Sequence, residues 1–240
     1  MTAAGAWRRR LPLGDRSREL ELLDRGLVRG PELATNLADL ARLNRLPGGR
    51  DASLAAVARL LDGRGTARVL DVGTGGADLP LAFARHGWDV VALDHDPDVL
   101  AIARAATAHE PHIDVVEGDG GVLPFDNGSF DVAHASLLLH HLDPGVAVAH
   151  LRELRRVARI GVVVNDLRRG MLPLLATGVS VALLGRCRTT RHDGLLSARR
   201  AYTTTELNEL LRRSGLAVVF RSAAWMPRVV TAAVPADATA

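Results

Sequence analysis

A glycine-rich turn follows the first apolar strand that the sequence predicts, and it carries residue types that bind cofactors. The segment 69–78 reads VLDVGTGGAD, with Asp71 near the end of the strand and Gly73 and Gly75 in the turn. Glycines let a backbone turn sharply and approach a ligand closely. A dinucleotide site needs a third glycine where this chain has Asp78, whose carboxylate would repel a pyrophosphate, so the turn disfavours NAD and FAD. Asp71 could pair with a cationic ligand, or it could accept backbone N–H groups of the turn.

Two further carboxylates follow the next two predicted strands. Asp94 ends the second strand, about where an acidic side chain reaches ribose hydroxyls in mononucleotide-binding folds, whereas Asp96 better suits the N-cap of the next helix. Asp119 and Gly120 follow the third strand. A carboxylate there can accept from an exocyclic amine, and the Gly120 N–H can donate to a ring nitrogen. The strand ends therefore favour a site for a nucleoside that tolerates acidic neighbours.

Histidines are the best candidates for a catalytic base. His140 and His141 follow the fourth predicted strand, on the cofactor side of the sheet, and an imidazole suits removal of a phenol proton near neutral pH. Consecutive residues at a helix start point in different directions, so at most one is expected to face the substrate, and both could merely cap or pack the helix. His192 with Asp193 is an alternative base and orienting partner, and Tyr202 could donate to a substrate oxygen. That region could equally be a solvated arginine-rich loop.

The elements that must position these residues alternate between strands and helices after residue 65. Strands are expected at 68–72, 89–93, 113–116, 130–135 and 160–164, and helices at 78–86, 97–109 and 144–158. This alternation predicts an α/β fold with a mostly parallel sheet and helices on both faces. The segments 216–221 and 228–234 are too close for a crossover helix, so they must pair as an antiparallel hairpin. Thr203 and Glu206 form a capping box at the start of a helix that precedes this hairpin and that Gly215 ends.

The chain divides into an N-terminal helical extension or lid, residues 1–64, and a core, residues 65–240. Leucine spacing predicts helical structure over 15–46 and a further helix from 51 to 63. An apolar run at 171–185 is too short to span a bilayer, which takes about 17 to 25 residues. It is interpreted as a buried or interface helix that lines a substrate pocket or forms a homodimer interface.

Taken in order, these motifs resemble those of the class I S-adenosylmethionine-dependent methyltransferases. The resemblance rests on DVGTGGA at 71–77, Leu93-Asp94, Gly118-Asp119, LPFDNGSFD at 123–131 and LHHL at 139–142. It covers about residues 65–234 and is greatest to the bacterial small-molecule subgroup related to quinone-biosynthesis methyltransferases. It implies a Rossmann-like seven-stranded sheet, mostly parallel, with an antiparallel last strand. Ala77 stands where the family commonly has its third glycine, so a slightly tighter turn is expected.

The resemblance also implies the cofactor, S-adenosyl-L-methionine, and the part of it that each residue contacts. Gly73 and Gly75 would approach the methionine part, and Asp71 would serve its ammonium group directly or through water. Asp94 would bind the ribose hydroxyls, and Asp119 with Gly120 the adenine. In this family a region such as 167–202, together with the N-terminal helices, often covers the substrate.

The predicted activity is methyl transfer to the hydroxyl of a small apolar metabolite that is phenolic, polyketide or quinone-like. A metal-assisted, catechol-type mechanism needs oxygen ligands after both the fourth and the fifth strand. Asn165 and Asp166 provide the latter, but Ala135 and Ser136 supply no carboxylate after the former, so no metal site is expected and a histidine base is favoured. C-methylation of an activated ring or enol could use the same base. A non-catalytic, cofactor-binding regulatory protein is the alternative of another class.

The amino-acid composition restricts the classes of molecule that the protein is expected to bind. All 30 cationic residues are arginine, and they are interspersed with acidic residues to a net charge of +3. The densest run, 8–10, is interpreted as a solvated tail, and the few aromatic residues disfavour base stacking, so no nucleic acid is expected. The single cysteine, Cys187, permits no internal disulfide, and the N-terminus lacks the apolar core of a signal peptide. The sequence predicts a cytoplasmic protein with a small-molecule acceptor and no stable membrane insertion.

Overall fold

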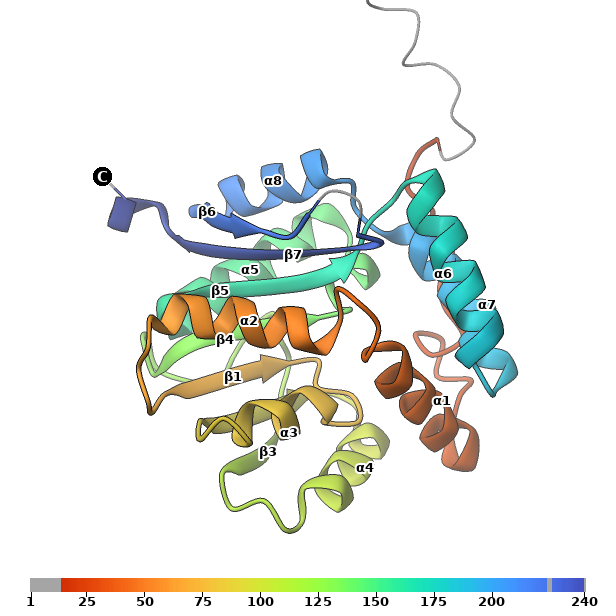
Figure 1. Ribbon diagram of the computed structural model, residues 1–240, viewed down its shortest axis with the longest axis horizontal. Coiled ribbons are helices and arrows are strands. Elements are labelled where there is room, and N and C mark those ends of the chain that lie inside the picture. The colour runs from red at the N-terminus through yellow and green to blue at the C-terminus, as the bar shows by residue number, and fades with distance from the viewer. Residues whose placement is uncertain (1–13, 224–225, 240) are drawn as a thin grey trace, which may run out of the picture.

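A seven-stranded sheet forms the centre of the computed structural model, which describes residues 14–223 and 226–239 (Figure 1). The arginine run at 8–10 lies outside the described residues. The strand order is β3-β2-β1-β4-β5-β7-β6. The strands are β1 (Arg68–Val72), β2 (Asp89–Asp94), β3 (Ile113–Glu117), β4 (Phe130–Ser136), β5 (Ala158–Leu167), β6 (Leu216–Arg221) and β7 (Arg228–Pro235).

The direction of the strands follows the prediction. Strands β1 to β5 pair in parallel, whereas β7 lies between β5 and β6 and is antiparallel to both. The hairpin of β6 and β7 is therefore confirmed, and so is the seven-stranded, mostly parallel sheet. Because the chain leaves β1 and β4 toward opposite sides of the sheet, the order reverses between them, and a ligand site is expected there at the carboxyl ends.

Helices cover both faces of the sheet. Their bounds are α1 (Gly30–Leu43), α2 (Arg50–Leu61), α3 (Asp78–Ala84), α4 (Pro97–Thr107), α5 (Pro144–Val157), α6 (Met171–Leu184), α7 (Arg188–Arg200) and α8 (Thr204–Arg213), with short 3-10 turns η2 (Leu139–His141) and η3 (Ala236–Thr239). Helices α2 and α3 share one apolar core with the sheet, and α5 and α8 share the core of the other face. The predicted caps are present: Asp96 accepts the Asp98 amide at 2.8 Å, and Thr203 and Glu206 form the capping box.

The N-terminal region differs from the prediction in two ways. Residues 15–29 are irregular, with a turn at 22–26, so the expected helix begins only at Gly30. The amides of Leu22 and Leu23 donate to the carboxylate of Asp193 at 3.1 and 3.3 Å, which replaces the hydrogen bonds of a helix. Helix α2 packs in the same core as β1 although it falls within the predicted extension. The division into a lid and a core stays a prediction.

Helices α1, α6 and α7 lie beyond the carboxyl ends of the strands (Figure 1). The arginine-rich segment after residue 186 is a helix, α7, with buried Thr190 and Asp193, so its interpretation as a solvated loop is wrong. Helix α6 is not a buried helix either, because only Pro173 and Val181 are buried along its length. None of the described helices combines the length and the hydropathy that a bilayer crossing requires.

Candidate active site

The glycine-rich turn between β1 and α3 is anchored to the end of β2. The amides of Gly73 and Thr74 donate to the carbonyl oxygen of Leu93 at 2.8 and 3.1 Å, and the amide of Gly75 donates to the carboxylate of Asp94 at 3.1 Å. Gly73 and Gly75 have φ angles of +72° and +54°, which L side chains adopt only with strain. The path of the backbone therefore requires both glycines.

Asp71 is buried and fully engaged by side chains. One carboxylate oxygen lies 2.6 Å from Nδ1 of His134 on β4, and the other accepts the Thr74 hydroxyl at 2.9 Å. Nε2 of His134 lies 2.9 Å from the hydroxyl oxygen of Ser53 on α2. These partners differ from the backbone N–H groups that were the sequence-based alternative. The role of Asp71 toward the cofactor ammonium stays a prediction, and these contacts favour the indirect form of it.

The other two strand ends place their carboxylates differently. Asp94 accepts from the amides of the next two residues at 2.8 and 3.2 Å, which fixes the carboxylate beside the glycine-rich turn. The side chain of Asp119 is 74% exposed, and one of its carboxylate oxygens accepts the Gly121 amide at 2.8 Å. A Cβ on Gly120 would lie 2.9 Å from Cγ1 of Val72, so the backbone passes close to the sheet there. Because β1, β2 and β3 are neighbours in the sheet, the structure brings all six predicted cofactor residues to one edge.

A buried polar network that the sequence did not predict supports the turn. Asn44 donates to Asp78 at 2.9 Å and accepts from Arg228 at 2.6 Å. Arg228 also donates to Asn165 and Ser136, at 2.9 Å each. Burial raises the pKa of Asp78, and burial lowers the pKa of Arg228 to about 10. The sequence carries no signal for this network, because Arg228 lies in an apolar strand more than 180 residues from Asn44.

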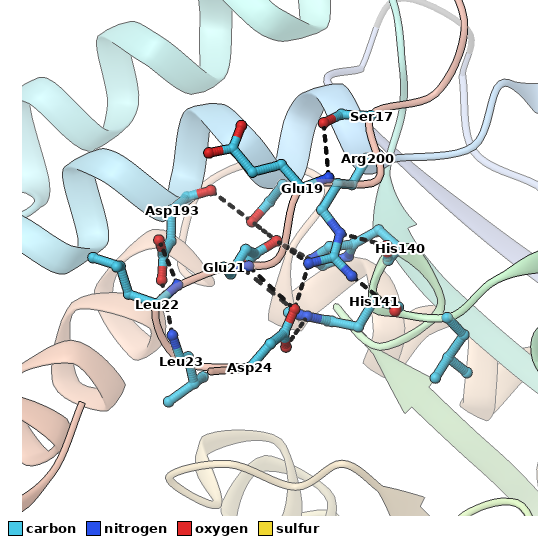
Figure 2. A network of polar contacts seen from close by, with 12 residues as sticks. Ser17, Glu19, Glu21, Leu22, Leu23, Asp24, His140, His141, Asp193 and Arg200 are labelled. Atoms are coloured by element: carbon cyan, nitrogen blue, oxygen red, sulfur yellow. Dashed lines mark hydrogen bonds and ion pairs between the residues drawn. The ribbon is translucent and has the colours of Figure 1, made fainter. Parts of the chain in front are cut away.

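His140 and His141 lie side by side at η2, and both face the segment before α1 (Figure 2). Nδ1 of His140 lies 2.6 Å from the carboxylate of Asp166, and Nδ1 of His141 lies 2.7 Å from that of Asp24. Nε2 of His140 and of His141 lie 3.7 and 4.0 Å from the two oxygens of Glu21. Both histidines line the same cavity, and the expectation that at most one faces the substrate stays a prediction.

The acidic residues of this cluster have different ionisation behaviour. Burial raises the pKa of Glu21 to about 7, although the charge of His141 opposes this. Burial alone would also raise the pKa of Asp24. Hydrogen bonds and charge interactions with His141 and Arg200 outweigh this effect and hold the pKa of Asp24 well below its usual range. No motif in the sequence marks Glu21, Asp24 or Arg200, because Glu21 and Asp24 lie in a stretch with leucines at helical spacing and Arg200 ends an arginine-rich stretch.

The structure does not bring the alternative base into the cavity. The side chain of His192 is 51% exposed, and its Nδ1 lies 2.8 Å from Asp193. His192 does not line the cavity, whereas Asp193 does and also holds the backbone of residues 22–23. The hydroxyl of Tyr202 donates to the carbonyl oxygen of Leu142 at 2.6 Å, and burial raises the pKa of this phenol to about 12. Tyr202 therefore serves the fold rather than a ligand.

The cavity itself has a volume of about 130 Å³ and lies between α1, α6, α7 and η2. Most of the surface that its wall exposes is apolar. The apolar residues of the wall are Leu23, Leu40, Leu43, Leu46, Pro47, Leu137, Leu167, Val181 and Pro227. The polar residues are Glu21, Asn36, His140, His141, Thr177, Ser180, Thr190, Asp193, Ser197 and Arg228. A cavity with a mostly apolar surface and polar groups that can orient a ligand is typical of a site for a small organic molecule.

The structure is a mostly parallel α/β sheet with a glycine-rich turn after β1, and it has an apolar cavity against residues that follow β4 and end β5. Residues 69–161 match the sequence model of a family described as a methyltransferase domain. An uncharacterized methyltransferase of Synechocystis is 29% identical over 156 residues, which are 63% of this chain and 68% of that protein. A demethylmenaquinone methyltransferase of Beutenbergia cavernae is 37% identical over 94 residues, which are 39% of this chain and 37% of that protein.

Solved structures with a similar fold are also methyltransferases. Magnesium protoporphyrin IX methyltransferase of Synechocystis, solved with bound SAH, superposes with a TM-score of 0.61 and 19% identity, covering 88% of this chain and 99% of that one. Residues 69–161 match a methyltransferase domain and the relatives are methyltransferases, which bears out the resemblance to the class I S-adenosylmethionine-dependent methyltransferases and the enzyme class that the sequence predicted. The match to the quinone relative spans less than half of that protein's length, so it does not carry an acceptor over to this chain.

Proposed function

We propose that this methyltransferase transfers the methyl group of S-adenosylmethionine to the oxygen of a small, mostly apolar metabolite with an acidic hydroxyl. The observation that carries the proposal is the cavity, whose leucine-rich wall meets two histidines at one side. A phenolic, polyketide or quinone-like acceptor fits this wall, and the demethylmenaquinone methyltransferase relatives support the same class.

The proposed cofactor site uses the edge formed by β1, β2 and β3. Gly73 and Gly75 give the methionine part close access to the backbone, and Asp94 accepts from the ribose hydroxyls. Asp119, which is exposed, accepts from the adenine amine beside Gly120. The SAH bound in the solved structural neighbour supports this cofactor. Because methyl transfer from a sulfonium is an in-line displacement, positioning and exclusion of water are the main contributions of the protein.

The histidine pair activates the acceptor in this proposal. Ionised carboxylates can only accept, so Nδ1 of His140 and of His141 donates to Asp166 and Asp24, and each Nε2 is the ring nitrogen that faces Glu21. Either imidazole could take the hydroxyl proton without a metal, as the sequence predicts. His192 is the weaker candidate because it lies outside the cavity wall. C-methylation of an activated ring is the alternative reaction, and it would use the same pair.

Calorimetry with S-adenosylhomocysteine tests the cofactor site. We expect the wild-type chain to bind this product and Asp94→Ala to bind about 10 to 100 times more weakly, because the variant loses the ribose acceptor and frees the Gly75 amide. Asp114→Ala, an exposed residue of β3, is the control and should bind like wild type. No binding by wild type, or equal binding by Asp94→Ala, would contradict the assignment.

Incubation with methyl-labelled cofactor and fractionated host metabolites identifies the acceptor. A labelled small molecule of apolar character supports the proposal, and mass analysis distinguishes an O-methyl from a C-methyl product. Binding of S-adenosylhomocysteine without any labelled product would favour the non-catalytic regulatory protein. We further propose a cytoplasmic location and no nucleic-acid partner, which the lone Cys187 and the dispersed arginines support.

A further inference from the structure

Glu21, His140 and His141 converge on one point at the wall of the cavity. One ligand atom from each, a carboxylate oxygen and two imidazole nitrogens, lies within 4.8 Å of the others. Glu21 and His140 are buried, and the side chain of His141 is 20% exposed. Figure 2 shows the three side chains pointing toward one another from two segments that are far apart in sequence. Two imidazoles and one carboxylate are a common ligand set for divalent transition metals.

Each histidine is held as metal-bound histidines are held in proteins. Asp166 accepts from Nδ1 of His140 at 2.6 Å and also from its backbone amide at 3.1 Å. Asp24 accepts from Nδ1 of His141 at 2.7 Å. A carboxylate bonded to the distal ring nitrogen fixes the tautomer and the orientation of a metal-binding imidazole. In both rings the Nε2 atom is the one that faces Glu21.

The distances show that a hydrogen bond does not join these groups. Nε2 of His140 and of His141 are 3.7 and 4.0 Å from the oxygens of Glu21, beyond hydrogen-bond range. Tetrahedral zinc ligands with bonds of about 2.0–2.1 Å lie roughly 3.4 Å apart. The three ligand atoms lie within 4.8 Å of one another, so the side chains would have to draw closer around an ion to complete a site.

The charge of the cluster also favours a cation. Three carboxylates, Glu21, Asp24 and Asp166, lie within 4.0 Å of the two imidazoles. Among the described residues, Arg200 is the guanidinium within ion-pair distance of these carboxylates; it contacts Glu21 at 3.9 Å and also pairs with Asp24. Three carboxyl groups therefore share a single guanidinium, and such a cluster can accommodate a divalent cation.

We propose that Glu21, His140 and His141 bind a divalent transition-metal ion such as Zn²⁺ at the wall of the cavity. All three ligands line the cavity, so the remaining coordination position is open to a small molecule. The sequence predicts no metal site because no carboxylate follows the fourth strand. In the structure the carboxylate of this cluster comes from Glu21, in the segment before α1. Mg²⁺ is a poorer fit, since it prefers oxygen ligands.

The use of the metal, unlike its binding, rests on the proposed function. A metal held by Glu21, His140 and His141 would lower the pKa of an acceptor hydroxyl beside it, so that the proton could pass to solvent. The acceptor oxygen would then form its bond to the methyl carbon while the electron pair of the breaking carbon–sulfur bond stays on sulfur, with no change in oxidation state. His140 and His141 would then serve as metal ligands in place of the base role proposed above.

Metal titration of the chelator-treated chain tests the site without any assay of methyl transfer. We expect calorimetry to show one Zn²⁺ or Co²⁺ bound per chain, and Mg²⁺ to bind far more weakly. The double variant Glu21→Gln/His141→Ala should lose at least about 100-fold in affinity. Asp24→Asn, which weakens the contacts of this side chain with His141 and Arg200, should lose about 10- to 100-fold. His112→Ala removes an exposed histidine paired to Asp89 and should leave the affinity unchanged.

Binding of S-adenosylhomocysteine reports whether each variant is folded and separates the two proposals. Retained binding of this product with no saturable metal binding by wild type, or with equal metal binding by the double variant, would overturn the metal site and leave the cofactor assignment standing. Metal binding without any product binding would overturn the cofactor assignment alone. A double variant that fails to bind the product is replaced by Asp24→Asn, whose retained wild-type metal affinity would also overturn the site.

Discussion

Gly49 shows at the scale of one residue how tightly the cofactor side is built. A Cβ at this position would lie 2.1 Å from the carbonyl oxygen of Asn44, which already accepts the Arg50 amide at 2.6 Å. We expect Gly49→Ala to lower the free energy of unfolding by at least about 2 kcal/mol, since backbone must move. Because Asn44 orients Asp78 and Arg228, product binding should weaken as well.

Gly145 is the matched control for urea unfolding of this variant. It lies in α5, and nothing approaches within 4 Å of the position its Cβ would take. Gly145→Ala should leave stability unchanged or raise it by up to about 1 kcal/mol, because alanine favours a helix. A Gly49→Ala chain as stable as wild type would show that the loop after α1 can move aside freely.

The residues of the site divide into those that the sequence predicts and those that it does not. Asp94 and the two glycines could be predicted because each lies at the end of an apolar strand, where topology places ligands. Glu21 and Arg228 could not, because their partners are distant in sequence and their own segments lack a motif. Ala77 has a left-handed φ of +60°, so the missing glycine costs backbone strain and not merely a tighter turn.

Among the elements, α8 gives a prediction about pH. Glu206 closes the capping box by accepting the Thr203 amide at 2.8 Å, and it pairs with Arg169 at 2.7 Å. Although partial burial opposes ionisation, these contacts hold the pKa of Glu206 below its ordinary value of 4.5. The ionised carboxylate therefore stabilises the fold above about pH 4.5, and this contribution is lost as the pH falls through the lower folded-state pKa.

Urea unfolding at several pH values, with wild type and Glu206→Gln, checks this expectation. The glutamine amide keeps the oxygen that accepts the Thr203 amide but loses the ion pair with Arg169. The Glu206 side chain in that ion pair is 42% exposed. Solvent screening limits the difference at pH 7 to about 1 kcal/mol or less. The difference should shrink below pH 4.5. A difference that is constant from pH 3 to pH 7, or one that grows on acidification, would contradict the assignment.

The elements also show where local patterns are sufficient. Each predicted strand is present in the structure. A short apolar run bounded by turn residues favours a buried strand where strands and helices alternate along the chain. Residues 15–29 have leucines at helical spacing, yet the segment is irregular because Asp193, far along the chain, takes its amide hydrogens. Spacing alone does not reveal such a tertiary contact, and the acidic side of the cavity depends on it.

At the scale of the whole molecule, α6 presents an apolar face to solvent. Its inner side reaches the cavity through Thr177, Ser180 and Val181. Leu172, Leu175, Val179 and Leu183 are 77%, 59%, 60% and 78% exposed, and their spacing of three and four residues places them on one face. No charged residue interrupts this helix, so two copies could approach without repulsion. From the sequence, this segment is expected either to line a pocket or to form a homodimer interface. In the structure the inner face of α6 lines the cavity, and its outer apolar face is exposed.

We therefore propose that a second copy of the chain covers this outer face, because a two-fold axis lets the same helix meet itself. Sedimentation velocity at increasing concentration should show a monomer–dimer equilibrium for wild type. Leu175→Glu/Val179→Glu places two charges in the contact and should leave a monomer that still binds S-adenosylhomocysteine. Leu27→Glu changes a leucine that is 61% exposed outside α6 and should dimerise like wild type. A wild-type chain that stays monomeric at high concentration, or a double variant that still dimerises, would exclude α6 as the interface between copies.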